Sequence, residues 1–245
     1  MIEAALFDLG DTLFHFELAN PRAVLEPAVR PLYDHLAEEG WKLPPFAAYL
    51  RIVRRQLVLA YLWSRIARRE VRFVQMVARG LRRSGIRVDA AQTLEWTRRH
   101  MLPVIHGFFK LDDDALSVVS ALHQAGLKLG VVSNTMLPGF AIDDSLEHCG
   151  LLKYFPVRIY SSEVGYMKPN RRIFRIALEA LGTQADRTVF IGDHLVNDLK
   201  GASRMGMQTV LASPNGAPRR MRIRPGHMIA RLAELPAVLG VEGHA

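Results

Sequence analysis

The sequence has few of the residues that build disulfides, thiolate metal sites or membrane spans. Cys149 is its only cysteine, which excludes an internal disulfide and a multi-cysteine metal site, and we expect a buried, inert thiol. No apolar run approaches the roughly 20 residues of a membrane-spanning helix. Residues 1–4 lack the basic start and cleavage site of a secretory signal. We therefore expect a cytoplasmic protein without a membrane span.

Acidic residues are nearly absent from one long segment. The whole chain has a net charge of +8, and residues 51–87 contain eleven Arg, no Lys and a single acid, Glu70. On one ideal helix, eight of these arginines share a face: Arg51, Arg54, Arg65, Arg68, Arg69, Arg72, Arg79 and Arg83. This stripe is either a solvated face or a site for a polyanion such as nucleic acid. We favour the solvated face, because Arg outnumbers Lys 26 to 6 in the chain and no nucleic-acid motif is present.

Residues 15–107 contain helical patterns only, without alternating or β-branched strand runs. Asn20-Pro21 predicts a helix start, and an apolar stripe follows, made of Leu25, Ala28, Val29, Leu32 and Leu36. After Pro44-Pro45 comes a basic amphipathic stretch that includes "LVLAYLW" at residues 57–63. This stretch could be buried in a bundle, face a partner or lie on a membrane surface. We expect burial in the bundle.

The remaining chain alternates short strands with helices. Strands are expected at residues 2–7, 128–134 ("KLGVVSN"), 157–162 ("VRIYSS"), 188–193 ("TVFIGD") and 208–213 ("QTVLAS"). A helix is expected at residues 171–181, closed by Gly182. This order predicts an α/β fold with a doubly wound parallel sheet. Its core comprises residues 1–14 and 108–245, and residues 15–107 form an all-helical insert.

Chemically useful side chains stand at the carboxyl ends of the predicted strands. Asp8, Ser133 and Asp193 each end a strand, and Lys168 follows another strand just before Pro169 begins a helix. In a doubly wound sheet these ends meet in one crevice. We therefore expect four residues that are far apart in sequence to form one site.

This order of motifs resembles the haloacid dehalogenase-like hydrolases, mostly phosphatases with an aspartate nucleophile. The resemblance covers nearly the whole chain and rests on four motifs: "FDLGDTL" with Asp8, "VVSNT" with Ser133, "MKPN" with Lys168, and "GDHLVND" with Asp193 and Asp198. It implies a Rossmann-like core with residues 15–107 as a helical cap domain inserted after the first motif.

The resemblance also implies roles for these residues in the hydrolysis of a small phosphorylated metabolite. Asp8 would be the nucleophile that forms an aspartyl-phosphate. Ser133, Asn134 and Lys168 would bind the transferring phosphoryl group. A Mg²⁺ ion would be held by Asp8, the backbone carbonyl of Gly10, Asp193 and Asp198, with Asn197 as a further candidate near the ion.

The chain departs from the family pattern at Gly10, where the phosphatases have a second aspartate that acts as general acid. Either Asp11 or His15 takes over this role, or hydrolysis is slow. One alternative function is 2-haloacid dehalogenation by the same nucleophile without metal. Another is polyanion binding by a weakly active core. We expect His194 to begin a helix, and residues 219–224 ("RRMRIR") to form a solvated connection before a last helix.

Overall fold

The computed structural model describes residues 1–16, 21–67, 70–214, 216 and 224–241. These residues belong to two compact units. The first unit contains residues 1–15, 111–135 and 143 onward, and the second contains residues 16–110 and 136–142. Within the described ranges, no helix combines the length and apolar character that crossing a membrane requires.

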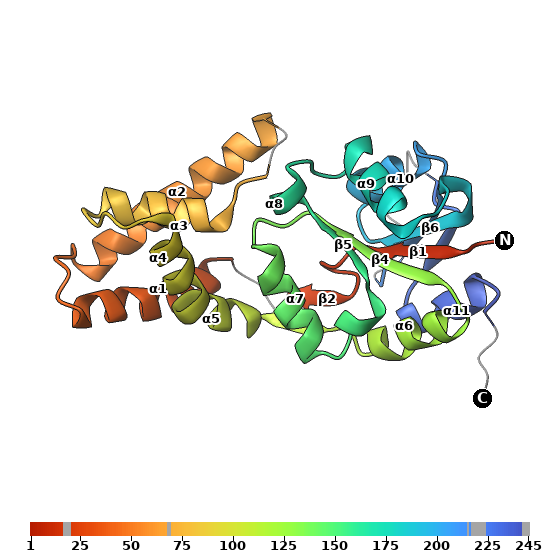
Figure 1. Cartoon of the computed structure of the whole chain (residues 1–245), viewed down its shortest axis with the longest axis horizontal. Helices are drawn as coiled ribbons and strands as arrows, with labels where there is room; N and C mark the ends of the chain where they lie inside the picture. Colours follow the sequence, from red (N-terminus) through yellow and green to blue (C-terminus); the bar gives the residue numbers. More distant parts are fainter. Residues whose placement is uncertain (17–20, 68–69, 215, 217–223, 242–245) are drawn as a thin grey trace. The chain divides into compact units, whose positions relative to one another are not determined.

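The first unit is built on a six-stranded sheet in the order β5-β4-β1-β6-β7-β8, and every neighbouring pair is parallel. The strands are β1 (Ala4–Phe7), β4 (Lys128–Ser133), β5 (Val157–Tyr160), β6 (Thr188–Gly192), β7 (Gln208–Ala212) and β8 (His227–Ile229). Helices α9 and α10 lie on one side of this sheet and α6 and α11 on the other (Figure 1). The predicted doubly wound α/β fold is confirmed. The short strand β8 was not predicted.

Short helices connect these strands. They are α6 (Ala115–Gln124), α7 (Gly139–His148), η2 (Leu152–Tyr154), α8 (Ser161–Val164), α9 (Arg171–Leu181), η3 (Ala185–Arg187), η4 (Leu195–Lys200), α10 (Gly201–Ser203), η5 (Leu232–Glu234) and α11 (Leu235–Val238). Helix η4 is a π-helical turn. It is a functional candidate because such turns often occur at functional sites.

Helix α9 illustrates how the sequence builds the core. The Asn170 side chain accepts a hydrogen bond from the Arg172 backbone N–H at 3.0 Å and caps the helix start. Gly182 ends the helix with a φ of 59°, which favours glycine. The buried face of α9 packs on the sheet. The rings of Phe174 and of Phe190 on β6 pack edge to face, with their centroids 5.3 Å apart. The predicted span of residues 171–181 is confirmed.

The second unit is a helical bundle made of α1 (Pro21–Glu38), α2 (Phe46–Ala67), α3 (Phe73–Arg83), α4 (Ala90–Trp96), η1 (Thr97–Met101) and α5 (Leu102–His106). Strand β2 (Phe14–Phe16) pairs with β3 (Phe109–Leu111) in a separate two-stranded sheet. Residues 15 and 16 are therefore extended, and the expectation that only helices follow residue 15 is wrong there. Three-residue strands leave too little alternation to detect. The expected N-cap Asn20 lies outside the described residues.

Three other expectations are wrong. The "LVLAYLW" stretch is not buried, because the side chains of Val58, Leu59, Leu62 and Trp63 are each about half exposed. The arginine stripe does not lie on one helix, because α2 ends at Ala67 and α3 begins at Phe73. Cys149 is half-buried rather than buried, although burial still raises the pKa of its thiol. Most of the basic connection at residues 219–224 lies outside the described ranges.

Candidate active site

The site lies at the carboxyl ends of three adjacent strands. Strand β1 lies between β4 and β6, so Asp8 after β1, Ser133 at the end of β4 and Asp193 after β6 come out on the same edge of the sheet. The Asp8 backbone N–H donates to the carbonyl of Ile191 at 2.9 Å, which continues the β1–β6 pairing up to the site. Ser133 is buried.

Lys168 joins two of the acids. Its side chain is buried, and its Nζ lies 2.7 Å from Oδ1 of Asp8 and 2.7 Å from Oδ1 of Asp198. Burial lowers the pKa of Lys168, but the charges of Asp8 and Asp198 outweigh it and raise the pKa above the ordinary lysine value. Lys168 is therefore a fixed positive charge between two carboxylates.

Three carboxylates converge at this point. One oxygen each of Asp8, Asp193 and Asp198 lies within 4.8 Å of the others. Burial raises the pKa of Asp8 to about 7, with Asp198 adding to the shift and Lys168 opposing it. Burial, together with the charges of Asp198 and Asp11, raises the pKa of Asp193 to about 6. One lysine does not balance three clustered acids, and their hard oxygen ligands suit Mg²⁺.

Asp198 is held from two sides, on the π-helical turn η4. Its Oδ2 accepts a hydrogen bond from the His194 backbone N–H at 2.9 Å. On its other side lies Gly192, where an added Cβ would stand 2.6 Å from Oδ2 and 2.8 Å from Cβ of Asp198. The glycine of "GDHLVND" is therefore required by the close approach of the acid six residues later. The motif alone did not indicate this requirement.

His194 begins η4, as predicted. Its Nδ1 accepts hydrogen bonds from the backbone N–H groups of Val196 at 3.1 Å and Asn197 at 3.2 Å. Asn197 follows His194 on the same turn and is partly exposed.

Asn134 holds the backbone of Lys168. Its Oδ1 accepts from the Lys168 N–H at 2.7 Å, and its Nδ2 donates to the Lys168 carbonyl at 3.1 Å. Buried Ser161 accepts from the Thr135 backbone N–H at 2.9 Å and donates to the Thr135 carbonyl at 3.2 Å. These pairs connect the loop after β4 to the segment that carries Lys168. Nothing in the sequence identified Ser161, which lies in a helical turn outside the four motifs.

The loop after Asp8 places Asp11 near the acids. Asp11 is exposed, and its φ of 53° is positive, unlike that of any other non-glycine residue in the described part of the chain. Gly10 is not among the glycines with positive φ. The Asp11 N–H donates to the Phe14 carbonyl at 2.7 Å and fixes this tight turn. The charge of Asp11 raises the pKa of Asp193, so the two carboxylates lie within electrostatic reach.

His15, the other expected proton donor, has a partner of its own. Its Nε2 lies 2.8 Å from Oδ2 of Asp112, and 39% of its side chain is exposed. The Asp112 N–H donates to the Leu13 carbonyl at 2.9 Å. His15 therefore ties the start of the chain to residue 112, whereas Asp11 acts on the acidic cluster.

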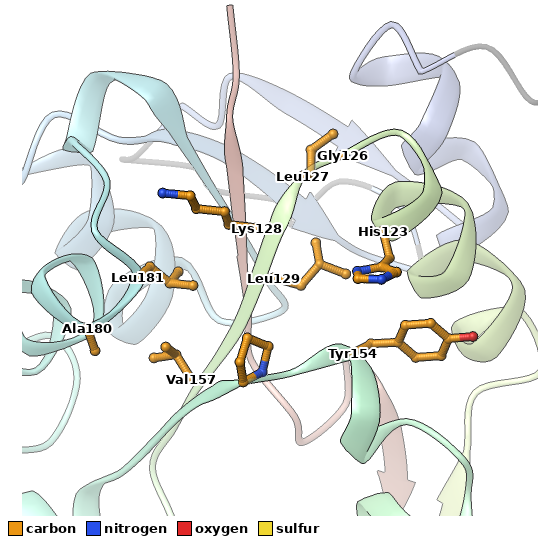
Figure 2. Close-up of a pocket in the computed structure, with 10 residues that line it drawn as sticks. His123, Gly126, Leu127, Lys128, Leu129, Tyr154, Val157, Ala180 and Leu181 are labelled. Carbon is orange, nitrogen blue, oxygen red and sulfur yellow. The ribbon is translucent and has the colours of Figure 1, made fainter.

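A separate pocket of about 390 Å³ opens at the other end of β4. Figure 2 shows its lining, which includes His123, Lys128, Tyr154, Val157 and Leu181. Lys128 begins strand β4, and Ser133, which lies at the site, ends it. This pocket is therefore distinct from the acidic cluster.

A model of a known protein family matches most of the chain. Residues 2–206 match the family model described as haloacid dehalogenase-like hydrolase. The chain is 28% identical over 241 residues to the HAD-hydrolase YfnB of Bacillus subtilis (strain 168), and the match covers 97% of this chain and 95% of that protein.

Two other relatives match over a shorter length. Glyceraldehyde 3-phosphate phosphatase of Methanopyrus kandleri is 34% identical over 105 residues, which cover 42% of this chain and 43% of that protein. Haloacid dehalogenase-like hydrolase domain-containing protein 3 of Danio rerio is 35% identical over 127 residues, 51% of each. The chain thus spans about half or less of the length of these two relatives.

A solved structure, the 2-haloacid dehalogenase from Pseudomonas syringae pv. Tomato DC3000, has a TM-score of 0.69 and 24% identity, with 98% of this chain and 99% of that chain covered. At this identity the similarity concerns the fold.

Proposed function

This chain belongs to the haloacid dehalogenase-like hydrolase family, and from this premise we propose that it is a Mg²⁺-dependent phosphatase acting on a small phosphorylated metabolite. The observation that carries the proposal is the convergence of Asp8, Asp193 and Asp198 within 4.8 Å, with Lys168 2.7 Å from two of them. The two carboxylates that one lysine leaves unbalanced offer hard oxygen ligands to a divalent cation. The phosphatase named among the relatives supports this choice of reaction.

Three carboxylates and one carbonyl would hold the ion. Asp8, Asp193, Asp198 and the Gly10 backbone carbonyl are hard oxygen donors of the kind that Mg²⁺ prefers. When bound, Mg²⁺ would neutralise the negative charge that otherwise repels a phosphate ester from the acids. It would also lower the pKa of Asp8 and Asp193, because a nearby cation favours the charged form.

The reaction divides into two displacements at phosphorus. A carboxylate oxygen of Asp8 forms a bond to phosphorus, and the ester P–O bond breaks with its electron pair on the leaving oxygen, which takes a proton. Water then attacks phosphorus and loses a proton to the group that protonated the leaving oxygen. This step releases Asp8 as a carboxylate together with inorganic phosphate. Lys168, the Ser133 hydroxyl and nearby backbone N–H groups, including that of Asn134, would stabilise the charge on the phosphoryl oxygens.

Asp11 would move the proton in both steps. It is exposed, it is adjacent to Gly10 and its charge reaches Asp193. His15 is engaged by Asp112 at 2.8 Å, so we favour Asp11. Because a positioned general acid is worth about 10² to 10⁴-fold, Asp11→Asn should slow alkyl phosphates more than aryl phosphates. His15→Asn should slow both equally or neither.

Residues 15–107 would serve as a cap domain that selects the substrate and excludes water during the reaction. The excess of arginine in this segment favours metabolites that carry more than one negative charge. Nucleic acid is a poor candidate substrate, because the chain has no known nucleic-acid motif.

One observation favours a second candidate, 2-haloacid dehalogenation. Gly10 leaves the site without the usual second acid, and a displacement of halide needs no proton donor. Against this candidate stands the full acidic cluster with Asp193 and Asp198. Release of chloride from 2-chloropropionate in the presence of EDTA would establish it.

The test is a panel of phosphate esters assayed with Mg²⁺ and with EDTA, using the wild-type chain and Asp8→Asn. We expect phosphate release that requires Mg²⁺ and falls on the order of 10³-fold or more in Asp8→Asn. Asp144→Asn, an exposed acid on α7, is the matched control and should act like wild type. Equal turnover by Asp8→Asn and wild type would refute the proposal.

A further inference from the structure

Helix α2 exposes a group of large apolar side chains, defined here as the α2 apolar patch. Val58, Leu59, Leu62 and Trp63 have exposed fractions of 53%, 47%, 50% and 51%. The patch is contiguous because Val58 and Leu62, and likewise Leu59 and Trp63, lie four positions apart on a helix, and Leu59 and Leu62 lie three apart. Solvent-exposed apolar groups of this size commonly mark an interaction surface.

The face of α2 opposite Val58 and Leu62 is already packed in the bundle. Tyr49, Gln56 and Ser64 are buried on that side. A Cβ built on Gly80 of α3 would lie 4.0 Å from Cγ2 of Val53, so the two helices pack closely. Helix α2 therefore has no freedom to turn the apolar patch into the bundle without losing this packing.

Arginines continue the same exposed face toward the start of the helix. At 100° per residue, Arg51, Arg55, Val58 and Leu62 fall within an arc of about 60°. Arg51, Arg54 and Arg55 are all exposed, and Arg54 and Arg55 stand four residues before Val58 and Leu59. The exposed face thus has a cationic half followed by an apolar half.

No acid balances this face. Helix α2 contains no Asp or Glu, and residues 51–87 contain only Glu70. A second copy of the chain would bring two sets of arginines together, which disfavours a symmetric dimer through this face. Nucleic acid would pair with the arginines but would leave three aliphatic side chains in water. An anionic lipid surface satisfies both halves, because headgroups meet the arginines and acyl chains receive the apolar patch.

We propose that the exposed face of α2 binds the surface of an anionic lipid bilayer. The helix lies in the plane of the interface rather than across it, since no described helix can span a membrane. Leu59 and Leu62 enter the acyl boundary, and Trp63 takes the interfacial position that tryptophan prefers. The arginines remain at the headgroups, with their aliphatic stems along the apolar surface. This binding does not depend on the phosphatase chemistry.

The test is co-flotation of the whole 245-residue chain with large unilamellar vesicles, either of phosphatidylcholine alone or of phosphatidylcholine and phosphatidylserine at about 7:3. We expect binding to the anionic vesicles at low salt, at least about tenfold weaker binding to neutral vesicles, and loss of binding at high salt. Arg54→Ala/Arg55→Ala should weaken binding about 25-fold, because each arginine near the surface contributes about fivefold. Leu62→Gln should weaken it about tenfold.

A matched control separates the patch from general hydrophobicity. Leu94 on α4 is 39% exposed, lies outside the α2 apolar patch and is followed by the acid Glu95, so Leu94→Gln should bind like wild type. Circular dichroism of each variant checks folding, and Trp63→Phe should remove any blue shift of fluorescence on anionic vesicles. Three results would overturn the proposal: no binding to anionic vesicles, equal weakening by Leu94→Gln, or a dimer in light scattering that Leu62→Gln dissociates while vesicle binding is unchanged.

Discussion

Gly192→Ala is the substitution that tests the geometry of the acidic cluster most sharply. The added Cβ would stand 2.6 Å from Oδ2, 2.7 Å from Cγ and 2.8 Å from Cβ of Asp198, where ordinary contacts begin near 3.4 Å. Asp198 would have to move by roughly 0.8 Å in a close-packed environment. Such a move stretches its 2.7 Å contact with Lys168 and its 2.9 Å hydrogen bond from His194.

We expect two measurable consequences of Gly192→Ala. Overpacking should lower the free energy of unfolding by about 1–3 kcal/mol, seen as a fall in Tm of roughly 3–10 °C. Displacement of Asp198 should weaken Mg²⁺ binding about 10- to 100-fold. The assay is phosphatase activity as a function of Mg²⁺ concentration, in which the half-saturating concentration should rise more than kcat falls.

Gly80→Ala is the matched control for Gly192→Ala. An added Cβ on Gly80 meets only Val53 at 4.0 Å, and alanine favours a helix interior over glycine, so the free energy of unfolding should rise by about 0.5–1 kcal/mol without a change in activity. The reasoning about Asp198 is refuted if Gly192→Ala folds like wild type and keeps the wild-type Mg²⁺ half-saturation.

Three further predictions concern the same site. Gly10→Asp should accelerate alkyl phosphates more than an aryl phosphate, because it supplies a general acid that a good leaving group does not need; equal change on both substrates contradicts the missing-acid hypothesis. The pKa values of Asp8 and Asp193 are raised from 3.8 to about 7 and about 6, so metal-free protein should lose stability as pH rises from 4 to 8, and Mg²⁺ should raise Tm more at pH 8 than at pH 5. A pH-independent Tm without metal would contradict the assigned cluster. Asn134→Ala removes both hydrogen bonds to the Lys168 backbone and should lower kcat about 10-fold or more; unchanged kcat would show that Lys168 needs no such support.

Much of the core could be predicted because its signals are local. A parallel strand buried on both faces is a short apolar run, and such runs were found for β1, β4, β5, β6 and β7. The ends of α9 were predicted because Asn170 and Gly182 are strong start and stop residues. The positions of the site residues could then be predicted from the strand ends, since the carboxyl ends of neighbouring parallel strands meet at one edge of the sheet.

Other features depend on contacts between distant segments, which a single sequence does not display. Strand β8 has three residues, two of them exposed, so it has no apolar pattern. An amphipathic helix has the same periodicity whether its apolar residues face a core or solvent, and for this reason α2 was expected to be buried. Asn134 supports Lys168, which lies 34 positions away in the sequence. Gly192 makes room for Asp198, which lies six positions away.

The central claim is that a carboxylate oxygen of Asp8 becomes bonded to phosphorus. The direct measurement is to mix enzyme, Mg²⁺ and an aryl phosphate, quench in acid within milliseconds, reduce acyl phosphates with borohydride and map the digest by mass spectrometry. We predict reduction to homoserine at position 8, only when substrate is present and at no other acid. A catalytically active sample with unmodified Asp8, or with the reduced residue at Asp11, Asp193 or Asp198, would contradict the account.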